Sequence, residues 1–199
     1  MARFRRSRHG LVSLDLQPVE ADVLASLARE VLELLDVPQR AVDPLQAELG
    51  LSDLPAVADL EAGDGSFGEG VGGPSAPPED DVLRRLLPDA YGSDDPRASA
   101  EFRRLTERGL RERKAAAARA LLDSLAPVAG QGGRVQLDAE GARTWLSALN
   151  DIRLALGTRL GVTEDVDPQD LPEDDPDRYA WAVYDFTTHL QETLVRSLG

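Results

Sequence analysis

Apolar stripes at helical spacing recur along this chain of 199 residues and limit it to a mainly helical fold. Apolar residues three or four positions apart share one face of an α-helix, and a helix buries that face against its neighbours. Stripes rich in Leu, Val and Ala cover about 18–36, 97–125, 138–160 and 177–198, and a two-turn stripe covers 80–87. We therefore predict a bundle of four to five helices.

Single residues mark where these helices begin and end. Pro18 suits a first helical turn, Asp138 suits an N-cap, and Gly161 suits the residue just past a helix end. Gly109 lies inside the longest stripe, where we expect a kink or a division. A weaker helical pattern runs over 44–49.

Two short strands are predicted within 3–16, around a turn at His9-Gly10. Val12, Leu14 and Leu16 alternate with polar residues, which is the period of a half-buried strand. A similar short segment at 134–137 can pair with this hairpin. The expected fold is thus mainly α, a helical bundle with a small antiparallel β-sheet.

One domain spanning 1–199 is expected, because the length suits a single core. Two segments, about 61–78 and 163–177, are predicted to be flexible loops. The first is rich in Gly, Ser and Pro, and no Gly-Lys-Ser/Thr ends it, which argues against a phosphate-binding loop. The second has eight acidic residues and no basic one between 164 and 177.

The composition excludes several classes of function. The net charge of -14 argues against a protein bound to an anionic membrane or along nucleic acid, and no sequence-specific DNA binding is expected. With no cysteine, the chain can form no disulfide and no thiolate site. No apolar run follows the arginine-rich start, so we expect a cytoplasmic protein. We interpret the single lysine, Lys114, as codon usage without a functional role.

Asp185, His189 and Glu192 are the most suggestive candidates for metal ligands. Their spacings of four and three place them on one side of the last helix. The same spacing describes an exposed polar face, which we favour, since the second histidine, His9, lies in the predicted turn. No catalytic residue, metal or other cofactor is therefore predicted.

A basic segment in this acidic chain offers the best hint of a binding surface. It contains Arg103, Arg104, Arg108, Arg111, Arg113, Lys114 and Arg119, against Glu101, Glu107 and Glu112. The alternative is a solvated helix face with ion pairs worth about 0.2 to 0.5 kcal/mol each. We favour that alternative but keep the first five arginines as a possible partner surface.

Asn150 and Arg153 interrupt an apolar helix and must be exposed or satisfied by hydrogen bonds. They either bond to neighbouring helices and orient the bundle, which we favour, or line a groove for a partner. Both are kept with the possible partner surface.

Three runs resemble one known family. They are Arg84-Arg85-Leu86-Leu87-Pro88 with Asp89-Ala90-Tyr91, then Trp145 through Gly157, whose Leu-Asn-Asp-Ile-Arg-Leu-Ala-Leu-Gly is the most specific part, and finally Tyr184 through Gln191-Glu192. In these runs the chain resembles the AosR oxidative stress regulator family of actinomycetes, formerly a domain of unknown function. The resemblance implies a regulator that senses oxidation through an intramolecular disulfide, engages an extracytoplasmic-function sigma factor and changes transcription of cysteine-biosynthesis genes.

This sequence departs from that pattern because it has no cysteine, so the disulfide switch cannot be carried over. The first hypothesis is a non-enzymatic, transcription-associated adaptor that binds a sigma factor or RNA polymerase. The second is a homodimeric structural or proteolysis-linked interaction module. The third, least favoured, is a metal-dependent enzyme using Asp185, His189 and Glu192.

Overall fold

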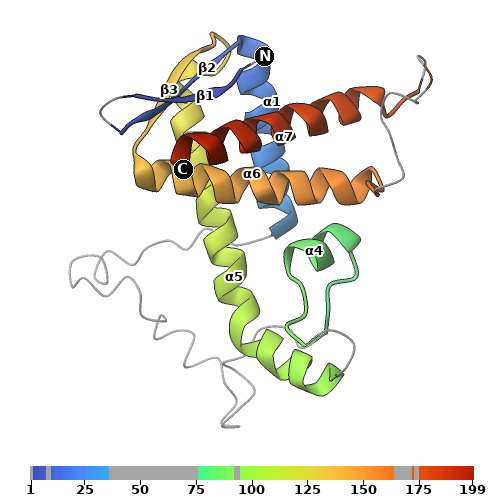
Figure 1. The fold of residues 1–199 in the computed structure, drawn as a ribbon. Coiled ribbons are helices and arrows are strands. Elements are labelled where there is room, and N and C mark those ends of the chain that lie inside the picture. Colours follow the sequence, from blue (N-terminus) through green and yellow to red (C-terminus); the bar gives the residue numbers. More distant parts are fainter. Residues whose placement is uncertain (1, 8–9, 36–75, 92–94, 164–171, 173–174) are drawn as a thin grey trace.

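The computed structural model describes residues 2–7, 10–35, 76–91, 95–163, 172 and 175–199. Within them lie a three-stranded sheet and five α-helices, which confirms the mainly helical fold (Figure 1). The helices are α1 (Pro18–Leu35), α4 (Asp81–Leu86), α5 (Pro96–Leu125), α6 (Ala139–Arg159) and α7 (Arg178–Leu198), and a short 3-10 helix (Ala126–Val128) follows α5. The predicted helix at 44–49 lies outside the described residues, as does most of both predicted loops.

The sheet has the strand order β1-β2-β3 and is antiparallel throughout, as predicted. Its strands are β1 (Phe4–Arg6), β2 (Val12–Leu16) and β3 (Gly133–Leu137). Leu14 pairs with Phe4 on one side and Val135 on the other, so the predicted alternation puts apolar side chains on one buried face. This sheet closes one end of the helical bundle (Figure 1).

Helices α6 and α7 lie side by side, and α5 crosses them on its way from the sheet end to the opposite end (Figure 1). α1 packs against α5, and α4 packs against α6. α5 is continuous through Gly109, so the helix is not divided there, and its amino-terminal turns bend away from the rest of the helix (Figure 1), which agrees with the kink that was the other expectation. That bent part reaches beyond the body formed by α1, α6 and α7.

Trp145 joins the sheet to the helices at the centre of the core. It is 1% exposed, and its ring meets Phe4 edge-on at a centroid distance of 5.6 Å. Its indole N–H donates to Ser124 Oγ at 2.8 Å, which satisfies the one polar group of the side chain. Most of the other large, fully buried side chains are leucines, and each of the five α-helices contributes at least one. They include Leu24, Leu121, Leu149 and Leu190.

The predicted helix caps are confirmed in α6. Asp138 Oδ1 accepts the Gly141 backbone N–H at 2.7 Å, and Gly161 adopts a φ of +61° just past the end. The expectation that the stripes over 97–125 and 177–198 bury their apolar side chains is wrong for three of them, since Phe102, Leu105 and Tyr179 are 44%, 64% and 69% exposed. All three belong to the amino-terminal parts of α5 and α7, where a stripe at helical spacing extends past the neighbouring helices.

Among the described residues, none of the helices is both long and apolar enough to span a membrane.

Candidate functional site

The basic segment of α5 divides between the interior and the surface. Arg103, Glu107, Arg111 and Lys114 follow spacings of four, four and three, which place them on one helix face. This face turns inward, toward α1, α6 and the segment after α4. Arg104, Arg108 and Arg113 lie outside it, so the structure does not bring the predicted surface arginines together.

Arg103 is the most buried arginine of the segment, with a side chain that is 4% exposed. It donates to Glu107 Oε2 and to Asp89 Oδ1, both at 2.5 Å, and to the Leu87 carbonyl at 3.4 Å. Burial disfavours its charge, but the two carboxylates outweigh burial and raise the pKa of Arg103 above its ordinary value. Arg103 therefore anchors the chain after α4, and its prediction as a surface residue is wrong.

Arg111 extends this network to a second helix. Its Nε donates to Glu107 Oε1 at 2.9 Å, and its Nη1 donates to the Leu35 carbonyl, also at 2.9 Å. Leu35 is the last residue of α1, so the guanidinium sits where an unpaired carbonyl and the negative end of the helix dipole favour a cation. Glu107, 2% exposed on its side chain, is shared between both arginines.

Lys114, further along the same helix face, forms a separate ion pair with Asp151 of α6, with 2.6 Å between Nζ and Oδ1. The Asp151 side chain is only 3% exposed, and burial raises its pKa, while Lys114 and Asn150 act in the opposite direction. The interpretation of this lysine as functionless codon usage is wrong, because it neutralises a buried carboxylate. We call Asp89, Arg103, Glu107, Arg111, Lys114 and Asp151 the α5 charge network.

On its outer side, α5 carries an exposed apolar surface. The Phe102 ring meets Tyr91 edge-on with centroids 6.0 Å apart, and both rings remain about half exposed. Leu105, one turn further along, is 64% exposed. We call Tyr91, Phe102 and Leu105 the α5 apolar patch. The sequence does not reveal this patch, because the spacing of Phe102 and Leu105 is the same as that of a core stripe.

Basic side chains lie beside this patch. Arg104 pairs with Glu101 at 3.0 Å and Arg108 pairs with Glu112 at 3.2 Å, so these two behave as the predicted solvated pairs do. Arg113 is exposed, two turns or more along the helix from the patch. Of the five arginines predicted in α5, Arg108 and Arg113 are exposed and Arg104 is partly exposed.

Arg153 and Asn150 bond to α7, in agreement with the favoured interpretation that they orient the bundle. Arg153 donates from Nε to Thr188 Oγ1 at 3.0 Å, from Nη1 to Gln191 Oε1 at 2.5 Å, and from Nη2 to the Tyr184 hydroxyl at 3.4 Å. Gln191 Nε2 also donates to Asn150 Oδ1 at 3.5 Å. Arg153 lies 5.5 Å from the centre of the Tyr184 ring as well.

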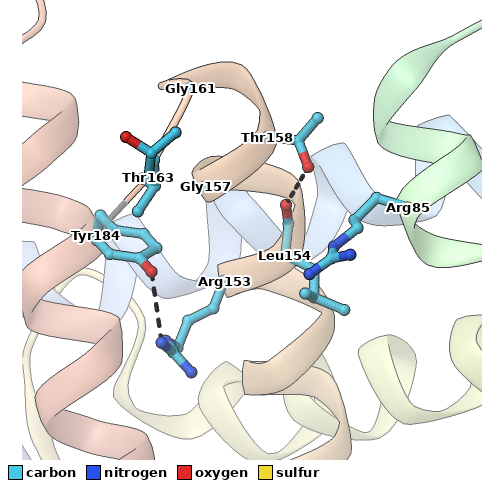
Figure 2. Close-up of a pocket in the computed structure, with 9 residues that line it drawn as sticks. Arg85, Arg153, Leu154, Gly157, Thr158, Gly161, Thr163 and Tyr184 are labelled. Carbon is cyan, nitrogen blue, oxygen red and sulfur yellow. Dashed lines mark hydrogen bonds between the residues drawn. The ribbon is translucent and has the colours of Figure 1, made fainter. Parts of the chain in front are cut away.

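A pocket of about 300 Å³ opens beside Arg153, between α4, the end of α6 and α7 (Figure 2). Arg85, Thr158, Thr163 and Tyr184 supply its polar wall, and Leu154 and Val162 its apolar wall. Arg85 and Tyr184 belong to runs that carry the family resemblance, yet nothing in the sequence indicates that they share a pocket.

Asp185, His189 and Glu192 do not form a ligand set. Asp185 and Glu192 are exposed, and Glu192 pairs with Arg196 at 3.1 Å. His189 Nε2 is buried and has no hydrogen-bond partner in the structure. Throughout the part of the chain that the structure describes, no group of three His, Cys, Asp or Glu side chains could hold a metal ion.

Comparison with known proteins bears out the resemblance. Residues 1–198 match the family model described as a domain of unknown function, DUF2017. The oxidative stress regulator AosR of Mycobacterium tuberculosis H37Rv is 33% identical over 192 residues, covering 90% of this chain and 78% of that protein. The same protein of Mycobacterium bovis gives the same figures.

The putative oxidative stress regulator AosR of Mycobacterium leprae is 39% identical over 133 residues, which cover 61% of this chain and 59% of that protein. No solved structure matches the chain. Because the family model covers almost every residue, the chain belongs to the DUF2017 family, and it is similar to proteins named as oxidative stress regulators AosR.

Proposed function

We propose that this protein is a non-enzymatic regulator of the oxidative stress response that acts by binding a component of the transcription machinery, a sigma factor or RNA polymerase. The names of its relatives support the regulatory part. The α5 apolar patch supports the binding part, and it is the observation that carries the proposal.

The patch has the composition of a protein-binding site. Two aromatic rings and a leucine are exposed together at the end of a helix that projects from the body (Figure 1). Exposed aromatics beside arginines are enriched among the residues that dominate binding energy at interfaces. Arg104 and Arg108 lie near the patch in ion pairs with Glu101 and Glu112, and Arg113 is exposed further along the helix, so this surface has an excess of one positive charge within a chain of net charge -14. The partner surface that fits is apolar at its centre and acidic at its rim.

This sequence of 199 residues includes no cysteine, so no disulfide within it can sense oxidation. In our proposal the chain supplies a docking platform, and the stress signal reaches it through the partner or through a ligand. The regulatory event is then a change in binding rather than a change in covalent structure.

Binding of the purified chain to core RNA polymerase and to each sigma factor of its own organism tests the proposal. The double variant Phe102→Ser, Leu105→Ser should weaken the interaction by about 30-fold or more, since the loss of a single central interface residue costs about 2 kcal/mol or more. The matched control is Tyr179→Ser with Val19→Ser, which removes two other exposed apolar side chains, 69% and 64% exposed.

The control should bind like the unmodified chain. Absence of binding to every one of these proteins, or equal binding by the patch variant, would contradict the proposal. Light scattering on the same samples tests the homodimer hypothesis. If the unmodified chain is a dimer and the patch variant is a monomer, the patch serves self-association instead.

A further inference from the structure

We infer that the pocket between α4, α6 and α7 binds a small organic oxyanion, a carboxylate or a phosphate, through Arg153 and Arg85. This binding does not depend on the proposed partner of the α5 apolar patch. The steps rest on the charges of the two arginines, on their partners and on the shape of the pocket.

Arg153 is a partly buried cation whose hydrogen-bond partners among the described residues are all neutral. Thr188, Gln191 and Tyr184 each accept one hydrogen bond, and no carboxylate of the described residues forms an ion pair with it. Glu192, on its far side, is already paired with Arg196. A partly buried charge without a counter-ion is costly, and a bound anion would remove that cost.

The three neutral contacts also hold the guanidinium ready for a ligand. A guanidinium has five N–H donors, and Arg153 uses three of them, which leaves one on each terminal nitrogen. Such a fixed fork suits the oxygens of a carboxylate or a phosphate. The Tyr184 ring and α7 keep the fork in place, so little side-chain entropy remains to be lost on binding.

Arg85 supplies the second cation from the other side of the pocket. It belongs to the last turn of α4, its side chain extends toward Leu154 (Figure 2), and among the described residues it makes no ion pair or hydrogen bond. None of the described residues that line the pocket is acidic. Within the part of the chain that the structure describes, two arginines and no acid therefore face this cavity.

The end of α6 also lines this pocket, and the negative end of its dipole opposes an anion. Its last carbonyls are engaged, however: Gly157 accepts from the Val162 N–H at 2.9 Å, and Thr158 accepts from the Gly161 N–H at 3.2 Å. With these carbonyls engaged, two full guanidinium charges outweigh the partial charge of a capped helix end.

The rest of the lining indicates what the anion is attached to. Leu154 and Val162 offer an apolar wall, and Thr158 and Thr163 add hydroxyls. Gly157 allows α6 to approach the Tyr184 ring closely, because a Cβ at this position would lie only 3.3 Å from Tyr184 Cε2. A volume of about 300 Å³ is at the lower end for ligand pockets and suits a small metabolite rather than a nucleotide.

Isothermal titration of the full chain tests the inference, with inorganic phosphate, succinate and citrate as probes at constant ionic strength in a chloride buffer. We expect saturable binding of at least one probe. Arg85→Gln should weaken it about tenfold, as the loss of one charge-assisted hydrogen bond would. The matched control is Arg143→Gln, an exposed arginine of α6 outside the pocket, which should not change the affinity.

Nuclear magnetic resonance locates the site without relying on a variant. Trp181 lies 6.0 Å from Tyr184 between ring centroids, whereas Trp145 lies in the core beside Phe4. The Trp181 indole signal should shift with the probe while the Trp145 signal stays. No saturable binding, equal losses in Arg85→Gln and Arg143→Gln, or binding of an acidic peptide but of none of the small anions would overturn the inference.

Discussion

Two groups of partly or fully buried charges lie on opposite sides of α6, and they are built on different plans. In the α5 charge network three bases, Arg103, Arg111 and Lys114, meet three acids, Asp89, Glu107 and Asp151. Between α6 and α7, Arg153 meets only hydroxyl and amide groups. The first group is electrically closed, and the second carries a positive charge without an opposite one.

This difference separates a structural group from a binding group. A buried ion pair contributes little over an apolar pair of the same shape, but loss of one member is costly because the other stays behind as a lone charge. The α5 charge network should therefore be intolerant of single changes. Arg153 already lacks a counter-ion among the described residues. Its removal therefore breaks hydrogen bonds but also removes the free-energy cost of a partly buried, unpaired charge.

The largest effect is expected for Glu107→Ala. This change leaves Arg103 and Arg111 without the carboxylate they share, and we expect the free energy of unfolding to fall by about 4 kcal/mol. Urea denaturation of the full chain measures it. Glu101→Ala, which removes an exposed partner of Arg104, should cost under about 1 kcal/mol. Similar losses in both variants would show that the network is not closed as described.

The pair of Lys114 and Asp151 should give the next largest effect and a dependence on pH. Lys114→Met leaves the Asp151 carboxylate buried without its cation, which should cost about 3 kcal/mol at neutral pH. Urea denaturation of the variant and the unmodified chain at a series of pH values measures this cost.

The sign of the pH dependence follows from the direction of the shift. Burial raises the folded pKa of Asp151 above the ordinary 3.8, so the folded state takes up its proton first as the pH falls. Lys114 lowers this pKa, so its removal should raise the folded pKa of Asp151 further in the variant. The cost of Lys114→Met should therefore be full above the folded pKa of the variant, shrink as the pH falls through it, and level off below the folded pKa of the unmodified chain. A cost that stays constant over this range would contradict the burial of a charged Asp151.

The outline of the fold was predictable because local signals determine it. Proline, aspartate and glycine set the ends of α1 and α6, and the alternation at Val12, Leu14 and Leu16 placed β2. These effects act within a few residues and therefore need no knowledge of tertiary contacts.

The charge network was not predictable for the opposite reason. Arg103, Glu107 and Arg111 at intervals of four have the pattern of a solvated ion-pair ladder, and only contacts with the distant Leu35 and Asp89 place them inside. The pocket likewise depends on α4 reaching the end of α6, which brings Arg85 toward Tyr184. No spacing in the sequence encodes that approach.

Replacement of Arg153 directly tests the contrast with the α5 charge network. Arg153→Met breaks three hydrogen bonds to α7 but also removes a partly buried, uncompensated charge, so we expect a loss of only about 1 kcal/mol. In urea denaturation with and without inorganic phosphate, the unmodified chain should gain stability from the anion, and the variant should gain much less. A loss as large as that of Glu107→Ala would place Arg153 in a closed structural group.

The smallest effect on stability is expected at the α5 apolar patch. Phe102 and Leu105 are largely exposed, so the double change to serine should alter the free energy of unfolding by less than about 1 kcal/mol, mainly through helix propensity. The same double change removes most of the apolar surface offered to a partner. When denaturation and partner binding are measured on one preparation of the double variant, its free energy of unfolding should therefore stay nearly unchanged while its binding to the partner is lost. If the double variant unfolded as readily as Glu107→Ala, these side chains would belong to the core after all.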